Sequence, residues 1–598
     1  MKKLKISSVY RLLILLLIGI YFNNLYIYIF ELIYLLLSDY KELLIYSILI
    51  ILILLSNSIR TDYLKYGIVE RKINNYYVIN KILYKDKIKT NDLNVGDLIV
   101  TFDSNYIDDE TYLKNNIKFE LLNYKKIYNF KLQKYINNII NSFNDDVKNP
   151  INKFIYNINN YDDMSFNLGY GLAIYYILKL ISKKSNLASL ILIILYSFVF
   201  YFDIKFYLLI IDNIFYKQDK NIRYFIKIIL ILIINKYLLN NYSILVTLLL
   251  NLYNCLNLKI KFNTYFAFMQ SILFGYINIL NLLVYKYILI IQIFLFVFSL
   301  ILLFIPQLSN IYLLLIKSYS NFNNIKFEIR GSLTIIGLMI YLILINVFNI
   351  KNNLLKLILI SSILFLPINN PFFHITFIDV GQGDSILIKS ELNKANILID
   401  TGSKFNYYKL KKYLYSQGIY RIDYLIITHD DSDHNGNLEL LNNDFKVKHI
   451  IYSNTSIEYG NINLINLYTN EYNNKNDSSL VYYLNKNNLS FLFTGDISSA
   501  CERKIIKEYS NLKVDVLKAS HHGSNTGNSE YFISNLLPRV CCISTNGMYG
   551  HPHKQTLKTL DMYKVDTYTT KNEGNITFFL TKIGNIMKTN KHGFVIIK

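Results

Sequence analysis

A short polar loop holds the residues of this 598-residue chain whose types and spacing best suit chemistry. The loop reads His429-Asp-Asp431-Ser-Asp433-His434 and follows the apolar run 424–427, which predicts a buried strand. The strand end fixes the first side chain, and the turn brings the last two back towards it. Imidazole and carboxylate groups together suit a divalent ion such as Zn²⁺ or Mn²⁺. We therefore expect His429, Asp431, Asp433 and His434 to bind one or two metal ions.

Later motifs supply further metal ligands. Asp496 follows an apolar run and precedes a turn of small residues, which places its carboxylate to bridge two ions. His521 or His522 should close the second metal position, and the sequence alone does not choose between them. Divalent ions held in this way would activate water for attack on a phosphodiester.

Other residues are candidates for catalysis or support. The catalytic candidates are Asp433, His551 and His553. Either of the last two could stabilise developing charge or protonate a leaving oxygen, and a structural role for their loop is an equal alternative.

Three side chains could act around the ligands. Asp400, in Asp-Thr-Gly, could orient a ligand through a hydrogen bond, or it could be only a turn residue. Gln382 could touch the substrate or a water molecule at the metal. Lys518 could meet a phosphate, although a solvated lysine at a strand end is the simpler interpretation.

Six motifs in this order resemble the metallo-β-lactamase fold, and the whole chain resembles the ComEC family of DNA-uptake channels. The motifs lie at 377–385, 397–402, 423–436, 491–496, 517–524 and 546–553. The resemblance implies a C-terminal αββα domain, with Asp496 as the bridging carboxylate, that hydrolyses one DNA strand. It covers about 370–598 strongly and the preceding chain only in outline.

The chain departs from the family patterns at several points. Asp431 replaces the middle histidine of the metallo-β-lactamase motif, as it does in the uptake family. A third-motif histidine is missing between His434 and Asp496, where the only histidine is His449. One metal position is thus a ligand short, which leaves full activity open. Residues 167–173 also lack the serine and histidine of the family's Ser-Gly-Leu-His signature.

The composition predicts a membrane protein that meets polyanions. Hydrophobic residues make up 52% of the chain and charged residues only 18%, while the formal net charge is +21. These values exclude a disordered, a collagenous and an ordinary soluble chain. The positive charge suits nucleic acid and anionic lipid equally well. Four cysteines without a CxxC pair give no disulfide framework.

The expected fold class is a multi-domain membrane protein. N-terminal transmembrane helices should span 1–59, a small β-rich, OB-like soluble domain 60–165, a polytopic α-helical channel domain 166–369, and a metallo-β-lactamase-like domain 370–598. The predicted spans are 9–22, 25–37, 42–57, 187–202, 224–239, 242–256, 264–284, 287–305 and 332–349, with shorter candidates at 169–182, 206–215, 308–316 and 353–366. Interleaved Tyr and Lys at 76–87 could stack bases and hold phosphates, or could form an ordinary solvated sheet face.

The resemblance implies uptake of transforming DNA. A channel would carry single-stranded DNA across the cytoplasmic membrane, and a metal-dependent nuclease domain would degrade the other strand. The alternatives are a membrane-anchored metallophosphodiesterase without a channel and a transporter with an inactive hydrolase domain. Expected partners are DNA, membrane lipid, a DNA receptor, a cytoplasmic motor or single-strand binder, and a second copy of the chain. We expect a multi-pass protein with extracytoplasmic soluble domains.

Overall fold

The computed structural model divides the chain into two compact units, each described here by itself. Unit 1 comprises 1–159, 165–265 and 280–326, and unit 2 comprises 160–164, 266–279 and 327–598. The structure describes 11–17, 40–58, 64–156 with short gaps, 186–200, 204–256, 262–323, 327–332, 370–467, 474–589 and 593–597, together with a few isolated residues.

Unit 1 contains a small closed β-barrel. Strands β1 (Tyr66–Ile73), β2 (Tyr76–Asn80), β3 (Lys85–Ile88), β4 (Asp97–Tyr106) and β5 (Ile117–Asn129) pair in the order β1-β2-β3-β5-β4. Alternate side chains point inward, so that Val69, Ile79, Ile99 and Leu121 form the core of the barrel. The barrel lies within the range in which the sequence predicts a β-rich domain.

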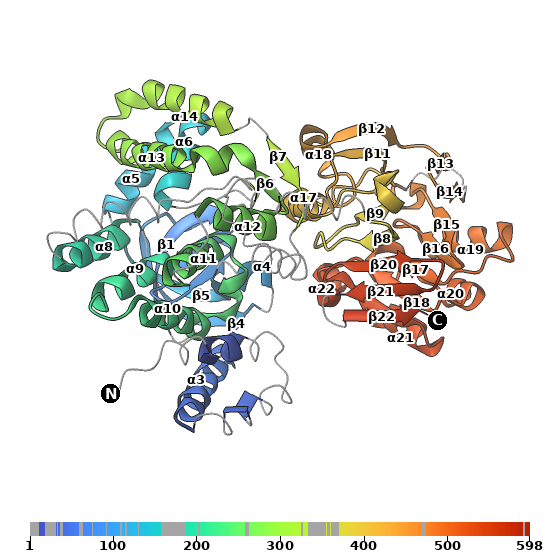
Figure 1. Cartoon of the computed structure of the whole chain (residues 1–598), viewed down its shortest axis with the longest axis horizontal. Helices are drawn as coiled ribbons and strands as arrows, with labels where there is room; N and C mark the ends of the chain where they lie inside the picture. The colour runs from blue at the N-terminus through green and yellow to red at the C-terminus, as the bar shows by residue number, and fades with distance from the viewer. Residues whose placement is uncertain are drawn as a thin grey trace. The chain divides into compact units, whose positions relative to one another are not determined.

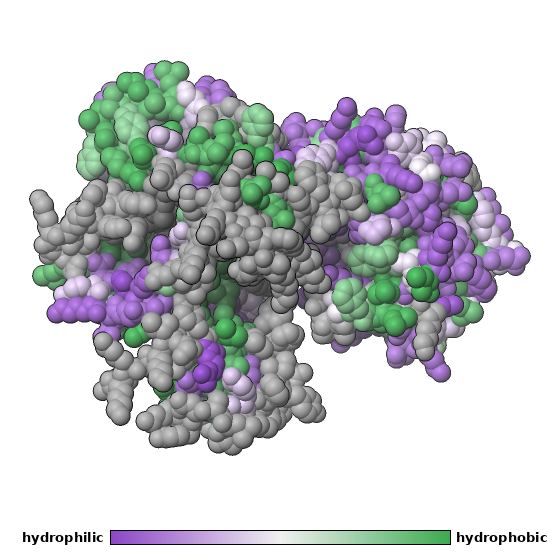
Figure 2. Space-filling model, viewed as in Figure 1, coloured by the Kyte–Doolittle hydropathy of each residue, from purple (hydrophilic) through white to green (hydrophobic). Residues whose placement is uncertain are grey.

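Helices make up most of the remainder of the described chain before residue 324 (Figure 1). Their bounds are α3 (Tyr40–Ser58), α4 (Glu110–Leu113), α5 (Lys131–Ser142), α6 (Asp145–Tyr156), α8 (Asn186–Phe200), α9 (Ile204–Ile214), α10 (Lys220–Ile234), α11 (Tyr242–Leu256), α12 (Phe262–Phe274), α13 (Ile279–Leu302) and α14 (Ser309–Asn323). Figure 2 shows hydrophobic side chains gathered over α13 and α14, where Leu283, Tyr287, Phe294 and Leu314 are exposed.

The predicted polytopic membrane domain is wrong for the part of the chain that the structure describes. The apolar run 224–239 is divided where α10 ends and a 3-10 helix (Lys236–Asn240) begins, and strand β6 (Tyr276–Asn278) divides the run 264–284. Helices α8, α10 and α11 have 15 residues each, about 22 Å, whereas the hydrocarbon core is about 30 Å thick. Among the described residues, no helix combines the length and apolar character needed to cross a membrane.

Several membrane predictions cannot be compared with the structure. The expected spans 9–22, 25–37, 169–182, 332–349 and 353–366, together with the signature region 167–173, lie largely or wholly outside the described residues.

Unit 2 is built on two facing β-sheets. The eight-stranded sheet has the order β12-β11-β10-β9-β8-β20-β21-β22, and the seven-stranded sheet the order β13-β14-β15-β16-β17-β18-β19. The first contains β8 (Phe373–Phe377), β9 (Ile386–Lys389), β10 (Asn396–Ile399), β11 (Arg421–Ile426), β12 (Lys446–Ile451), β20 (Ile576–Leu580), β21 (Asn585–Thr589) and β22 (Gly593–Ile597). The second contains β13 (Ile457–Tyr459), β14 (Ile462–Asn466), β15 (Tyr482–Lys486), β16 (Leu489–Phe493), β17 (Val516–Lys518), β18 (Val540–Ile543) and β19 (Asp566–Thr569).

The two sheets enclose the main core and carry helices on their outer faces. Phe377 and Phe578 of the first sheet meet Phe491 of the second in one buried cluster. Helices α19 (Ser499–Glu508), α20 (Glu530–Leu536) and α21 (Lys554–Met562) pack on the other face of the second sheet. Helix α17 (Tyr407–Ser416) lies against the first, where the Tyr413 hydroxyl donates to Thr376 Oγ1 at 2.8 Å. Helix α18 (Leu438–Asp444) leads into β12. This is the predicted αββα metallo-β-lactamase fold.

A short two-stranded sheet also belongs to unit 2. Strand β6 pairs antiparallel with β7 (Glu328–Arg330), well before the predicted domain start at 370. The guanidinium of Arg330 is buried and lies 4.2 Å from the ring centroid of Tyr415 and 4.9 Å from those of Tyr420 and Phe445.

Candidate metal centre

Parallel strands bring the predicted site residues to one edge of the sandwich. Strands β10 and β11 are parallel neighbours in one sheet, and β16, β17 and β18 are parallel neighbours in the other. The carboxyl ends of parallel strands meet at one edge, so the segments that follow them converge. Asp400 follows β10, His429 follows β11, Asp496 follows β16 and His522 follows β17.

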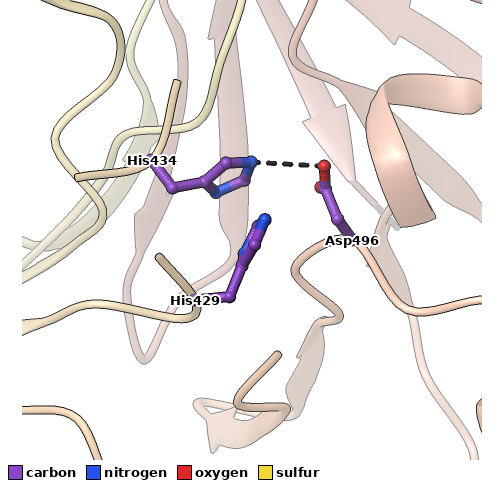
Figure 3. Close-up of side chains that lie close together, drawn as sticks. All are labelled: His429, His434 and Asp496. Atoms are coloured by element: carbon purple, nitrogen blue, oxygen red, sulfur yellow. Dashed lines mark ion pairs between the residues drawn. The ribbon is translucent and has the colours of Figure 1, made fainter. Parts of the chain in front are cut away.

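Two overlapping groups of side chains could hold metal ions. His429, His434 and Asp496 form one group, called site A, and Asp433, His434 and His522 form a second, called site B; two further groups overlap these and include Asp384. Within each group the candidate ligand atoms lie within 4.8 Å of one another. Figure 3 shows His429 and His434 side by side, facing Asp496.

Asp496 connects the two groups. Its Oδ2 lies 3.3 Å from His434 Nε2 and 3.3 Å from His522 Nε2, and the latter nitrogen is 3.2 Å from Asp433 Oδ2. One carboxylate oxygen therefore faces both the histidine that the two groups share and the second histidine of site B. The sequence could not choose between the two adjacent histidines, and the structure brings His522 into site B.

Two further side chains near site A are less buried than the histidines of site B. Asp431 is half-buried, with its Oδ2 3.5 Å from His429 Nε2. His521 is also half-buried, and its Nε2 lies 3.8 Å from Asp496 Oδ2, at the border of the cluster. Ser479, which the sequence analysis missed, holds His429 from behind, with its hydroxyl 3.2 Å from Nδ1. No signal in the sequence would have singled out this serine.

Hydrogen bonds at Nδ1 fix the orientation of the His434 and His522 rings. His434 Nδ1 lies 2.8 Å from Asp400 Oδ2, and His522 Nδ1 lies 3.0 Å from the carbonyl oxygen of Ser544. In each ring the N–H at Nδ1 donates to that oxygen, which leaves Nε2 for a metal. Asp400 also accepts from the N–H and hydroxyl of Thr428 at 2.8 and 2.7 Å, so its carboxylate connects His434 to the residue before His429.

Lys518 is buried rather than solvated. Its Nζ donates to the carbonyl oxygen of Gly495 at 2.7 Å and lies 2.5 Å from Asp384 Oδ2 and 3.4 Å from Asp496 Oδ1. Lys518 thus contacts Oδ1 of Asp496, whereas Oδ2 faces the histidines. Asp384 is a site residue that the sequence analysis quoted in a motif but did not assign; its position in the glycine-rich loop 381–384 was the available signal.

The remaining predicted residues lie at the edge of the cluster. The ring of His551 lies 6.3 Å from that of His522, and its buried Nδ1 has no hydrogen-bond partner in the described part of the chain. His553 Nδ1 accepts from the N–H of Asn525 at 3.0 Å, which makes it a link between two loops. Gln382 is buried and accepts a 3.4 Å hydrogen bond from the Thr545 hydroxyl.

Opposite charges control ionisation in the cluster. Burial disfavours the charged form of His434, but the carboxylates of Asp496 and Asp400 outweigh it and raise the pKa of this imidazole well above its usual value. For His522 burial is likewise outweighed, chiefly by Asp496 and Asp384, and its pKa is also raised well above the usual value. Burial and the two neighbouring histidines, His522 and His521, lower the pKa of His551 to about 4.

The cluster fits a divalent metal ion. Among the residues that the structure describes, no hydrogen bond satisfies the buried Nε2 atoms of His429, His434 and His522; carboxylate oxygens of Asp431, Asp433 and Asp496 lie 3.2 to 3.5 Å from them. A buried polar atom without a hydrogen bond is costly, and three imidazole nitrogens that face a group of carboxylates form a donor set suited to a divalent cation.

The chain is similar to known metallo-β-lactamase-fold proteins. A family model described as the metallo-beta-lactamase superfamily matches residues 378–473. Among solved structures, a diphosphatase of the PhnP family is 15% identical, covering 35% of this chain and 99% of that one, with a TM-score of 0.24. A zinc-dependent hydrolase of the same superfamily from Thermotoga maritima is 14% identical over 31% and 86% of the two chains, with a TM-score of 0.22. At these TM-scores the two structures add nothing to the fold assignment, which rests on the strand order.

Three curated proteins are similar to part of this chain. "ComE operon protein 3" of Bacillus subtilis is 28% identical over 253 residues, covering 34% of this chain and 33% of the relative. "Recombination protein 2" of Haemophilus influenzae is 28% identical over 38% and 32%, and "Competence protein ComA" of Neisseria gonorrhoeae is 25% identical over 35% and 33%. The matched part is about a third of each relative's length. The resemblance to the ComEC family that the motifs predict is thereby confirmed, with a metallo-β-lactamase domain at the C-terminal end.

Proposed function

We propose that this chain takes part in DNA uptake and that its metallo-β-lactamase domain is a metal-dependent phosphodiesterase acting on DNA. The single observation that carries the proposal is the cluster of three buried imidazole Nε2 atoms around the Asp496 carboxylate. Its relatives supply the substrate class, since two of them are named for recombination and for competence.

The chain's own residues divide the work at the site. His434 belongs to both groups but can bind only one ion through Nε2. With His522 and Asp433 it would hold an ion at site B, which leaves His429, Asp431 and the shared carboxylate of Asp496 for a more weakly held second ion at site A. Bound ions would supply Lewis acidity and activate water for attack on phosphorus. Asp400 and Lys518 keep His434 and Asp496 in orientation through the contacts described above.

His551 is best placed to face the substrate. Because its pKa is lowered to about 4, the imidazole is neutral at pH 7. A neutral ring can donate one hydrogen bond to developing charge but holds no surplus proton for a leaving oxygen. Of the two roles expected for this histidine, the proposal therefore keeps charge stabilisation.

Hydrolysis of a labelled single-stranded oligonucleotide by the purified full chain, with Mn²⁺ or Zn²⁺, tests the enzyme. Asp433→Asn and His434→Ala should each lower the cleavage rate at least a hundredfold, because each removes a ligand of site B. His449→Ala is the matched control: this histidine lies in β12, where its ring stacks on Tyr424, outside both sites. A folded, metal-loaded wild-type chain that cleaves no DNA would leave an inactive hydrolase domain as the better hypothesis.

Uptake itself needs a test in cells. A strain in which this gene is disrupted should lose transformation by added DNA, and normal transformation would refute the uptake role. The passage of single-stranded DNA, a location at the cell membrane, a DNA receptor, a motor or single-strand binder and self-association all stay predictions.

A further inference from the structure

The loop that carries His521 and His522 has a constrained backbone. The two residues have φ angles of 48° and 54°, in the left-handed region that side chains rarely adopt. Two such residues in succession persist only where the surrounding structure fixes them. Because His522 belongs to site B, whatever fixes this loop also fixes a metal ligand.

Glu502 of α19 is the group around which this loop is organised. The side chain is buried, and its two carboxylate oxygens accept four hydrogen bonds from the segment 520–529. Oε1 accepts from the Ser520 hydroxyl at 2.9 Å and the Asn528 N–H at 2.5 Å. Oε2 accepts from the N–H and the hydroxyl of Ser529 at 2.9 and 2.8 Å. One carboxylate thus binds both ends of the segment.

Asn528 closes the same segment from within. Its Oδ1 accepts from the Ser520 N–H at 2.9 Å, and its Nδ2 donates to the carbonyl oxygens of Ser520 and Ser524 at 2.8 and 3.1 Å. The left-handed histidines lie between the groups that these bonds tie together. The loop is therefore closed on itself and attached to α19 through Glu502.

Helix α19 also connects the loop to Asp496. The helix begins at Ser499, whose N–H and hydroxyl donate to the Thr526 carbonyl oxygen at 2.8 and 2.7 Å. A Cβ atom at Gly527 would lie only 2.9 Å from the carbonyl oxygen of Ile497, so the loop is in direct contact with the turn after Asp496. These contacts join the loop that carries His522 to the turn that follows Asp496.

We propose that Glu502 is a positioning residue for the metal centre. By clamping the segment 520–529 onto α19, it sets the 3.3 Å separation between His522 Nε2 and Asp496 Oδ2 and thereby the affinity for a divalent ion. Glu502 acts through the loop and is not itself a member of site A or site B. The inference rests on the proposed metal centre but not on DNA cleavage.

Binding of Co²⁺ by the full chain, followed by visible absorption, tests this role. Glu502→Gln keeps the size of the side chain but replaces an acceptor oxygen with an NH₂ group that cannot accept the bonds from Ser529. We expect Co²⁺ to bind about 10- to 100-fold more weakly, with a changed absorption spectrum, because the geometry of the ligands changes. Glu508→Gln is the matched control, since this exposed glutamate lies on the same helix and undergoes the same change; it should behave as the wild type.

A folded Glu502→Gln chain with wild-type Co²⁺ affinity and spectrum would overturn the proposal. If that variant does not fold, Ser520→Ala removes only one hydrogen bond to the same carboxylate. It should shift the spectrum and weaken binding several-fold, and an unchanged chain would again refute the proposal. A wild-type chain that binds Co²⁺ but cleaves no DNA would remove the proposed function while leaving this inference intact. One that binds no Co²⁺ would remove both.

Discussion

At the scale of single residues, protons and metal ions compete for the same atoms. Without metal, the neighbouring carboxylates raise the pKa of His434 and His522 well above the usual value, which favours the charged form of both imidazoles beside Asp400, Asp384 and Asp496. A metal ligand must be neutral, so binding has to release these protons. The raised pKa values therefore weaken metal binding in acid and favour it as the pH rises.

We accordingly predict a steep pH dependence of metal affinity. Between pH 6 and 8 the apparent Co²⁺ affinity should rise about ten- to a hundredfold per pH unit, with one to two protons released per ion. Calorimetry in buffers of different ionisation enthalpy measures this release directly. His521 serves as a comparison, because burial lowers its pKa, so His521→Ala should leave the proton count unchanged. Binding without proton release at pH 7 would contradict the prediction.

The candidate metal ligands could be proposed from the sequence because several of them lie close together in the chain. His429 to His434 lie within one loop, and the alternation of acids and imidazoles is visible in the text of the chain. The choice of His522 over His521 was not available, because it depends on two left-handed backbone angles. The burial of Lys518 could not be predicted either, since its partner Asp384 lies 134 positions earlier in the chain.

At the scale of elements, the loops at the strand ends depend on close backbone contacts. The glycine-rich loop 381–384 lies against the metal-ligand loop, and the Asp384 N–H donates to the Asp433 carbonyl oxygen at 3.2 Å. Gly383 has a φ angle of 112°, and a Cβ atom there would lie 2.1 Å from the same oxygen. A side chain at Gly383 must therefore displace one loop from the other.

Gly383→Ala tests this contact between loops. We expect a loss of about 1–3 kcal/mol of stability, from strain and displacement, together with weaker Co²⁺ binding as Asp433 and His434 move. Thermal unfolding and Co²⁺ titration measure the two effects. Gly584→Ala is the matched control, because nothing lies within 4 Å of a Cβ atom there. Equal behaviour of the two variants would show that the loop contact is unimportant.

The strands of the C-terminal domain were easier to predict than the helices before it. Buried runs such as 424–427 end at polar motifs, and both features are local. Hydropathy alone did not show where the apolar runs before residue 324 are divided. At Asn235 the side chain accepts from the Tyr237 N–H at 3.0 Å and donates to the Leu113 carbonyl oxygen at 2.7 Å. A hydropathy average over neighbouring residues does not reveal a contact with a residue 122 positions away.

At the scale of the whole molecule, the C-terminal unit extends beyond its predicted start at 370. Arg330 donates hydrogen bonds to the carbonyl oxygens of Ile419 and Asp444 at 2.9 and 3.0 Å, and it lies against the rings of Tyr415, Tyr420 and Phe445. A buried guanidinium with these partners stabilises the corner formed by α17, β11 and the end of α18. Composition could not reveal this attachment, because a lone arginine in an isolated short strand gives no signal of its own.

Fragments of the chain test where this unit begins. A fragment 327–598 should be more stable than 370–598 by about 2–4 kcal/mol, because only the longer one keeps Arg330 in contact with its carbonyl and aromatic partners. Urea unfolding measures the difference. Arg330→Met in the longer fragment should remove most of it, whereas Arg539→Met, at a side chain that is 58% exposed, should cost little. If both fragments were equally stable, the contacts of Arg330 would not stabilise the unit, and the independently folding unit would begin at 370.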